Sequence, residues 1–374
     1  YRDATERENL IIQSNFVADF DFAGVSHTLL FGGEYAIQNS DNNRRDVVFD
    51  STGTDQVSFL FSDPLVVPSF GFPGLTRDTD SDVTVLSFYA QDQIDVGKHF
   101  KIVGGVRYDR FEIDVLDILE NTDGDTNNGL TGRVDTEWSP RVGFIYKPEE
   151  NISFYASYSR SFLPRSGNQF VSLSPTNAAL APEQPGNYEA GLKWDITPGL
   201  SLTTAIFRLD REGGTTVDPD NVDRTIIIGS RTEGFEAQLV GEILPGWSLN
   251  AGYSYLDGDE RGRVVDGALA NRTLSQVPEH LFSLWNRVEV TEKLSFGVGA
   301  TYQDEQFASI SNAVELPDFI RFDAAVYYQL SDDVKLQLNV ENLFNADYFP
   351  AAHNDNNIST GEPLNARLSI SARF

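Results

Sequence analysis

The sequence contains no cysteine and no methionine in 374 residues. Without cysteine, disulfide bonds, thiolate metal sites and cysteine nucleophiles are all excluded. Basic residues are scarce as well: 28 Lys and Arg stand against 56 Asp and Glu, so the net charge is 28 − 56 = −28. Such an acidic chain is unsuited to nucleic acid, because a phosphate backbone requires a basic surface.

Long apolar runs are also absent. No stretch approaches the roughly 18 apolar residues that a membrane-spanning helix needs, and the mean hydropathy is −0.29. Transmembrane β-strands escape this test, because their alternating apolar and polar residues average out. A hydrophobic fraction of 40% argues against wholesale disorder. Length alone allows two or three soluble domains or one large β architecture.

What is present is alternation of apolar and polar residues. In Val334–Glu341 every even position is apolar and every odd position is polar. A period of two over eight or more residues predicts strands with one apolar face and one solvated face. We find no convincing amphipathic helix. The same pattern occurs in residues 152–158, 247–255, 320–328 and 367–374.

The connections between these runs are of two sizes that alternate along the chain. Tight turns rich in Gly, Pro or acidic residues are predicted at 22–25, 95–98, 147–150, 197–199, 244–246, 291–293 and 331–333. Between them lie long polar segments, approximately 40–80, 118–133, 164–186, 212–230, 257–278, 304–318 and 345–363. Strict alternation of short and long connections is typical of an outer-membrane barrel, with short periplasmic turns and long extracellular loops.

Counting the runs predicts an all-β fold: a transmembrane antiparallel up-and-down β-barrel with about fifteen strands in this chain. Aromatic residues near the ends of several runs fit an interfacial girdle, namely Tyr158, Phe162, Trp247, Tyr255, Tyr348 and Phe349. A soluble sandwich or propeller is the alternative, but no repeat of roughly 40–50 residues is visible. Closed single-chain bacterial barrels have even strand numbers, so either one strand is misjudged or the N-terminal part of the barrel is missing.

Several motifs, in this order and over nearly the whole chain, resemble the C-terminal part of a TonB-dependent siderophore receptor. The end of the chain carries the most specific of them, with Leu338–Asn345, Tyr348, Gly361–Pro363 and the terminal Phe374. The sequence after His353 resembles catecholate-type ferric siderophore receptors. The other motifs are Tyr89–Gln93, Gly105–Asp109, Tyr158–Phe162, Tyr188–Asp195 and Gly229–Glu236.

The resemblance implies a bacterial outer-membrane barrel of about 22 strands, plugged by an N-terminal domain. We therefore expect residues 1–374 to be a partial barrel domain that lacks the plug, the first strands and the TonB-binding segment. The resemblance also implies that Phe374 is read by the barrel assembly machinery. The transported ligand would be a ferric siderophore captured by the loops and released by a TonB-driven pull, with no covalently bound cofactor.

A ferric catecholate is anionic, so local arginine clusters at the mouth must attract it against the overall charge. Guanidinium groups and aromatic rings both suit catechol rings. The candidate ligand-binding residues are Arg44, Arg45, Arg77, Phe162, Arg165, Phe170, Arg231 and Arg272. For each arginine the alternative is contact with lipopolysaccharide, or pairing with an adjacent acid such as Asp41 or Asp46.

Catalytic and metal sites are not indicated. His27, His99, His280 and His353 lack metal-ligand spacing with one another. The segment 123–129 mimics the start of a calcium loop, but Asn128 replaces the required Gly and Val134 the bidentate Glu. We therefore expect a transporter rather than an enzyme. A passive general porin is the rival, since 374 residues suit a complete barrel of about 16 strands; for an adhesin there is no positive signal.

Overall fold

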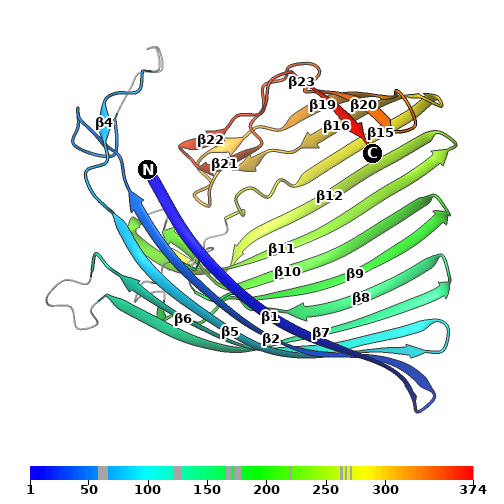
Figure 1. Cartoon of the computed structure of the whole chain (residues 1–374), viewed down its shortest axis with the longest axis horizontal. Coiled ribbons are helices and arrows are strands. Elements are labelled where there is room, and N and C mark those ends of the chain that lie inside the picture. The colour runs from blue at the N-terminus through cyan, green and yellow to red at the C-terminus, as the bar shows by residue number, and fades with distance from the viewer. Residues whose placement is uncertain are drawn as a thin grey trace.

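The fold is a single antiparallel sheet that curls into an open trough (Figure 1). The computed structural model describes residues 1–57, 66–120, 129–165, 170–171, 173, 178–218, 221–261, 264–265, 268–269 and 272–373. The sheet has fifteen strands, the number expected from the sequence. They are β1 (Arg2–Phe22), β2 (Val25–Arg45), β5 (Arg77–Val96), β6 (Phe100–Asp117), β7 (Leu130–Glu149), β8 (Ile152–Arg160), β9 (Gln184–Thr197), β10 (Leu200–Asp218), β11 (Asn221–Leu244), β12 (Trp247–Arg261), β15 (His280–Thr291), β16 (Leu294–Gln303), β19 (Phe319–Gln329), β20 (Val334–Glu341) and β23 (Asn365–Ala372).

Each strand pairs with its neighbours in chain order, so the topology is strictly up-and-down. The seven predicted tight turns are confirmed, and all lie at one end of the strands, while the long connections lie at the other (Figure 1). In the β1–β2 turn, Ala23 and Gly24 both have positive φ angles, 53° and 83°. Two consecutive positive φ values match the twist of the flanking strands, which explains the two-residue connection.

Several predicted loops are shorter than the sequence pattern indicated, because the strands continue past the membrane-length alternation. The segment 212–230 was expected to be a loop, but β10 and β11 extend through nearly all of it. Likewise, β2 continues to Arg45, inside the predicted loop 40–80. The other loops carry small hairpins: β3 (Val48–Phe49) with β4 (Phe70–Gly71), β13 (Val264–Val265) with β14 (Ala268–Leu269), β17 (Gln306–Phe307) with β18 (Glu315–Leu316), and β21 (Ala351–Asn354) with β22 (Asn357–Ser359).

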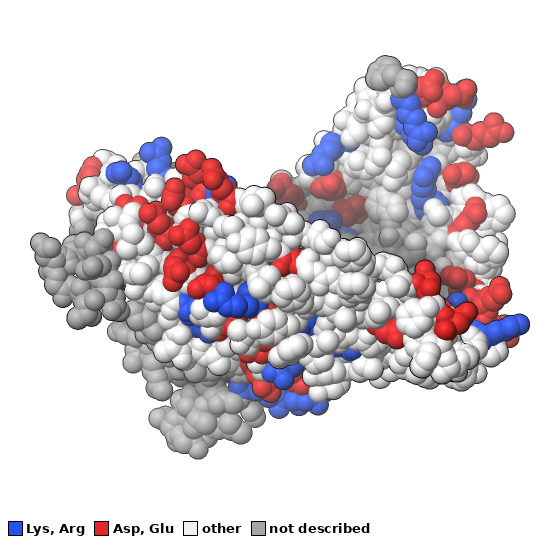
Figure 2. Space-filling view, turned by 60° about the horizontal axis from the view of Figure 1, so that its bottom comes forward, with Lys and Arg blue, Asp and Glu red and all other residues white. Residues whose placement is uncertain are grey.

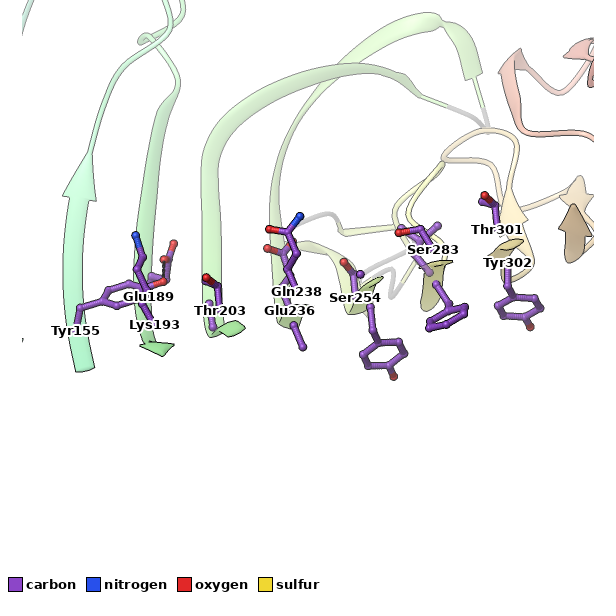
Figure 3. Close-up of a pocket in the computed structure, with 16 residues that line it drawn as sticks. Tyr155, Glu189, Lys193, Thr203, Glu236, Gln238, Ser254, Ser283, Thr301 and Tyr302 are labelled. Atoms are coloured by element: carbon purple, nitrogen blue, oxygen red, sulfur yellow. Dashed lines mark hydrogen bonds between the residues drawn. The ribbon is translucent and has the colours of Figure 1, made fainter. Parts of the chain in front are cut away.

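The two faces of the sheet differ in polarity, as the alternation predicted. We call the concave face the inner face and the convex face the outer face. On β16, Thr301 points to the inner face and Tyr302 to the outer face (Figure 3). The outer face carries exposed apolar side chains along the strands, such as Ile206 at 61% and Val298 at 51% exposure. This distribution suits a sheet with lipid on one side and an aqueous interior on the other.

Aromatic side chains on the outer face form two belts, one beside the tight turns and one near the middle of the long strands β6 and β7. Toward the long connections, Tyr108 packs on Trp138 with ring centroids 5.0 Å apart. Toward the tight turns, Phe100 stacks on Tyr146 at 4.9 Å. Trp138 and Tyr146 are eight residues apart on β7, which is about 27 Å along the strand and about 20 Å across a membrane at a typical tilt. Predicted girdle residues Tyr158, Trp247 and Tyr255 occupy the outer face, whereas Phe162, Tyr348 and Phe349 pack among the loops.

Charged side chains gather toward the two ends of the strands, and neutral side chains cover much of the middle of the face seen in Figure 2. No helix in the described part of the chain is long and apolar enough to cross a membrane.

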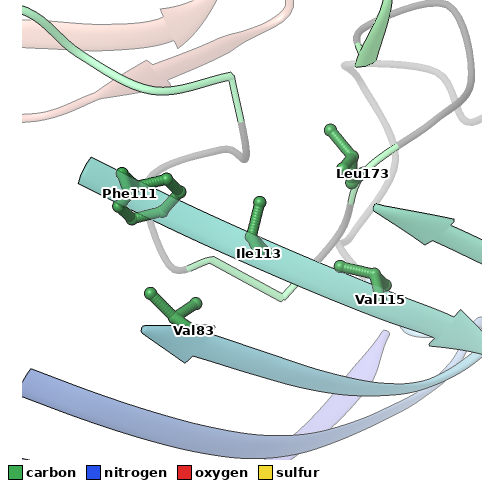
Figure 4. Close-up of a cluster of buried hydrophobic side chains, with 5 residues drawn as sticks. All are labelled: Val83, Phe111, Ile113, Val115 and Leu173. Carbon is green, nitrogen blue, oxygen red and sulfur yellow. The ribbon is translucent and has the colours of Figure 1, made fainter. Parts of the chain in front are cut away.

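The largest apolar cluster lies on the inner face near the long connections (Figure 4). Ile113, fully buried, is at its centre, and Leu173 from the β8–β9 connection covers it. Thr79 Oγ1 donates a hydrogen bond of 2.8 Å to the carbonyl oxygen of Val171 in the same connection. Val171 and Leu173 are thereby held against the inner wall. The remaining buried members of the cluster are Val83, Phe111 and Val115.

Candidate ligand-binding site

The loop ends of β1, β2 and β5 bring three predicted arginines into one place. Arg44 at the end of β2 is the cross-strand partner of Arg77 at the start of β5, and of Asp3 on β1. Cross-strand partners point to the same face, and the strand register places this row on the inner face. Arg45 is paired with Arg2 in the next row, on the opposite face. Two of these arginines therefore face the interior at its mouth.

Aromatic rings lie beside two arginines of this region, Arg44 and Arg2. The Arg44 guanidinium lies over the Tyr1 ring, 3.8 Å from its centroid, and the Arg2 guanidinium lies 5.9 Å from the centroid of Phe72. Phe72 in turn meets Phe70 edge-to-face at 5.8 Å. We call Tyr1, Arg2, Arg44, Arg45, Phe70, Phe72 and Arg77 the mouth cluster. Planar cations beside aromatic rings are the chemistry expected to hold an anionic ring-containing ligand.

Only one cation of the mouth cluster is neutralised by a carboxylate among the described residues. Arg44 Nε donates to Asp46 Oδ1 at 3.0 Å, and this hydrogen bond, together with one from Thr76, holds the pKa of Asp46 below its usual range. Arg45 and Arg77 make no ion pair with any residue that the structure describes. The mouth cluster therefore retains positive charge in a strongly acidic chain.

Three further candidates fold the β8–β9 connection inward. Phe162 and Phe170 pack against the apolar cluster on the inner wall. Arg165 is 7% exposed, and its Nη1 lies 2.8 Å from Glu183 Oε1. Arg211 contacts the other oxygen of the same carboxylate at 2.5 Å. Burial lowers the pKa of Arg165, and Glu183 opposes that effect. The guanidinium of Arg165 is thus held by Glu183 and faces little open solvent.

The last two arginines lie apart from the mouth cluster. Arg231 is on the outer face of β11, where it and Arg208 both donate to Asp210, at 2.6 and 2.8 Å. Its guanidinium is thus held by a carboxylate, which matches the alternative of pairing with an acid. Arg272 lies in the connection after β12, where its Nη1 donates to the carbonyl oxygen of Ile310 at 3.2 Å.

Lower on the inner face, polar side chains from β8 to β16 line a cavity of about 530 Å³ (Figure 3). Tyr155 donates a 2.5 Å hydrogen bond to Glu189, and Lys193 lies 5.7 Å from the centroid of the Tyr155 ring. Glu236 adds a second carboxylate to the lining. Sequence reasoning did not propose a site here: Tyr155 entered only as part of an alternating run, and Glu189, Lys193 and Glu236 only as members of family-like motifs.

Two expectations fall outside the described residues, namely the assembly signal Phe374 and the calcium-like motif up to residue 128. Within the described ranges, no group of three or more His, Asp or Glu side chains is arranged to hold a metal ion. Tyr1 and Arg2 were missed by sequence reasoning. The signal that identifies them is strand register, because they meet Arg44 and Arg45 only once β1 and β2 are aligned.

The family model that matches this chain, over residues 1–343, is described as TonB dependent receptor-like, beta-barrel. Among curated proteins, the chain is 27% identical to the "Probable TonB-dependent siderophore receptor PiuA" of Acinetobacter baumannii, covering 99% of the chain and 53% of that protein. It is 28% identical to the "Metal-pseudopaline receptor CntO" of Pseudomonas aeruginosa, with coverages of 100% and 52%. It is 26% identical to the "Catecholate siderophore receptor Fiu" of Escherichia coli, with coverages of 97% and 50%.

Solved structures of siderophore receptors also match this chain. The crystal structure of PiuA from Acinetobacter baumannii matches with a TM-score of 0.84 at 26% identity, over 99% of this chain and 56% of that one. The closed form of Fiu from Escherichia coli matches with a TM-score of 0.80 at 23% identity, over 99% and 55%; at that identity it supports the fold alone. The chain spans about half the length of the curated relatives it matches.

Proposed function

Because this chain belongs to the family of TonB-dependent receptor-like β-barrels, which reside in the outer membrane, we propose that it serves in the import of ferric siderophores. The family consists of transporters rather than enzymes. The proposed cycle is capture of the ferric chelate at the mouth, followed by release toward the periplasm, energised by TonB. No covalent chemistry is required of the protein in this cycle.

The observation that carries the ligand proposal is the mouth cluster. Arg77 faces the interior without a carboxylate partner among the described residues, and Arg44 stacks on Tyr1. A catecholate chelate presents planar rings and anionic oxygens, which match aromatic stacking and guanidinium donors together. We therefore propose a catecholate-type ferric siderophore as the ligand, as the name of the Fiu relative also suggests.

Some parts of the proposal concern partners. The exposed outer face with its two aromatic belts fits contact with outer-membrane lipids, and Arg231 with Arg208 on that face fits lipopolysaccharide phosphates. The aromatic terminus Phe374 is proposed as the signal for the barrel assembly machinery.

The proposal is tested by uptake. The full-length protein is produced in a Gram-negative strain that lacks its own siderophore receptors, and the probe is the radiolabelled ferric complex of 2,3-dihydroxybenzoate. Accumulation of iron that stops when the proton gradient is collapsed is the expected result. Arg77→Gln is expected to weaken surface binding about tenfold, the loss of one charge-assisted interaction. Arg110→Gln is the matched control, since Arg110 pairs with Glu112 on the outer face.

Two outcomes contradict the proposal. Iron accumulation that is unaffected by collapse of the proton gradient, together with steady single-channel conductance in planar bilayers, indicates a passive porin. Equal effects of Arg77→Gln and Arg110→Gln on binding remove the mouth cluster as the ligand site.

A further inference from the structure

Three of the long connections share an apolar core that lies outside the fifteen-stranded sheet. They are the segments 272–279, 304–318 and 342–364, which lead into β15, β19 and β23, and we call them together the rim unit. Ala308 and Leu316 of the second segment are buried with Ala352 of the third. Val314 and Phe349, again from the second and third segments, pack against these three. The core therefore joins segments that are far apart in the chain.

Hydrogen bonds join the first segment to the second. Asn312 Nδ2 donates to the carbonyl oxygen of Thr273 at 2.9 Å, and Asn312 Oδ1 accepts from the Thr273 amide at 3.0 Å. The Gln276 amide donates to the carbonyl oxygen of Phe307 at 3.0 Å. Asn312 thus satisfies both backbone groups of Thr273, as a neighbouring strand would.

The third segment is bonded to both of the others. Gln306 Nε2 of the second segment donates to the carbonyl oxygen of Pro350 at 3.0 Å. The amide of Ala352 donates to Oε1 of Gln276 in the first segment at 3.4 Å. Each segment of the rim unit therefore contacts the other two.

Asn342 fixes the third segment to the sheet. This residue is 1% exposed and has a positive φ of 52°. Its Nδ2 donates to the carbonyl oxygens of Ala346 at 2.8 Å and Glu362 at 3.0 Å, and its Oδ1 accepts from the Ala346 amide at 2.8 Å. Its own amide donates to Asp323 Oδ1 on β19 at 2.9 Å. The two ends of the third segment are thereby closed on each other and held to a strand.

The β8–β9 connection is held by different contacts. Thr79 on β5, Arg133 on β7 and Arg211 on β10 bond to its described residues. These contacts lead to the wall of the sheet. The β8–β9 connection is therefore an internal control for any change in the rim unit.

We propose that the rim unit is cooperative, so that its three segments open to solvent together and remain closed together. Loss of one segment removes core and hydrogen-bond partners from the other two, and such mutual dependence defines a cooperative unit of structure. A ligand or partner that contacts one segment therefore acts on all three. The inference does not depend on the identity of the transported ligand.

The test is hydrogen–deuterium exchange of the full-length receptor in detergent, read by mass spectrometry on peptides that report one amide in each segment, those of Gln276, Ala308 and Gly361. Asn312→Gly removes the two bonds to Thr273, and glycine tolerates the positive φ of 55° at that position. Exchange is expected to rise at least tenfold in all three segments, the effect of losing two hydrogen bonds.

A second variant perturbs the unit from its other side. Asn342→Gly, also at a positive φ, is expected to raise exchange in the first and second segments as much as Asn312→Gly does. Asn356→Gly is the matched control, because Asn356 is exposed in the third segment and its side chain bonds to no described residue. The first and second segments are expected to exchange as in wild type in this control.

Three outcomes overturn the inference. A rise confined to the substituted segment shows independent loops. A rise that includes the amide of Leu163, which bonds to Glu183 across the base of the β8–β9 connection, shows general loosening of the protein. An Asn356→Gly variant that exchanges like Asn312→Gly shows an effect of glycine alone. None of these outcomes bears on the proposed function, which is tested separately by uptake.

Discussion

Seven arginines are paired with a carboxylate two residues further along the chain, namely Arg44, Arg107, Arg110, Arg133, Arg208, Arg287 and Arg321. Arg107 with Asp109 and Arg321 with Asp323 are examples, at 2.7 and 2.9 Å. Residues i and i+2 of a strand share a face and lie roughly 7 Å apart, so long side chains reach each other. Arg77 and Arg141 have no acid at either such position, and both remain unpaired among the described residues.

That spacing makes part of the candidate site readable from the sequence. The i, i+2 spacing predicts the ion pair of Arg44 with Asp46. It also predicts that Arg77, which has no acid at such a position, makes no ion pair of this kind. The spacing does not predict the pairing of Arg165 with Glu183, or of Arg231 with Asp210. Those contacts join positions 18 and 21 residues apart, and only the fold brings them together.

We predict that the substitution Asp46→Asn strengthens binding of the ligand at Arg44. Removal of the carboxylate frees Arg44 from its competing partner, so affinity for the ferric 2,3-dihydroxybenzoate probe is expected to rise about two- to fivefold, as for an exposed ion pair. Binding to receptor-bearing cells at neutral pH measures it. If the affinity for the probe is unchanged or lower in Asp46→Asn, Asp46 does not compete with the ligand for Arg44.

The wild-type pH profile is a companion measurement. The pKa of Asp46 is lowered by its hydrogen bond to Arg44, so the carboxylate stays charged down through its ordinary range near pH 4. The stabilising pair is present above that range and is lost only as pH falls through the lowered pKa. The gain from Asp46→Asn is therefore expected to be the same at pH 7 and pH 5. A gain that fades between these values argues against the pairing.

The elements themselves were largely predictable, because alternation with a period of two is a local property. Val334–Glu341 is β20 residue for residue, and the tight turns lie where Gly and Pro predicted them. Strand extensions beyond the membrane were not predictable, since β10 and β11 continue through a polar, Gly- and Asp-containing segment that lacks alternation. The backbones of β10 and β11 are paired through most of this segment.

Glycines facing aromatic rings on the inner face are a second feature of the elements. A Cβ on Gly191 of β9 would lie 2.7 Å from the ring of Tyr155 on β8. The ring thus occupies the space above the glycine, as aromatic side chains often do in curved sheets. Gly297 stands in the same relation to Trp285, at 2.5 Å.

We predict that Gly191→Ala destabilises the barrel by about 1–3 kcal/mol, the usual cost of overpacking. Gly104→Ala on β6 is the matched control, because nothing lies within 4 Å of its added Cβ. The melting temperature of the full-length protein in detergent, followed by heat-modifiable electrophoretic mobility, is the measurement. A control that melts as low as Gly191→Ala contradicts this account.

For the whole molecule, the main assignment is which side chains of the sheet face lipid and which face the interior. Leu338 and Asn339 are consecutive on β20 and point to opposite faces, Asn339 to the inner one with Ala325 and Arg367. The sequence pattern divided the residues between two faces correctly, but it did not locate the cavities. Those depend on which strands become neighbours and how the sheet curves.

The assignment is tested by a pair of substitutions. Leu338→Arg puts a cation into lipid, at a cost of about 2–4 kcal/mol near the membrane midplane, and is expected to reduce the folded fraction in the outer membrane several-fold. Asn339→Arg faces the aqueous interior and is expected to fold as wild type. Equal losses for the two substitutions, read from heat-modifiable mobility, refute the division into faces.

The up-and-down order of the sheet has a consequence for how the molecule is made. Every strand pairs only with strands adjacent to it in the chain, and seven of the fourteen pairings are hairpins closed by tight turns. Each pairing therefore joins strands that are close in the chain, and loop-closure entropy stays small for every one of them. No strand of this sheet has to find a partner that is distant in sequence, which limits the chances for mispaired edges during assembly.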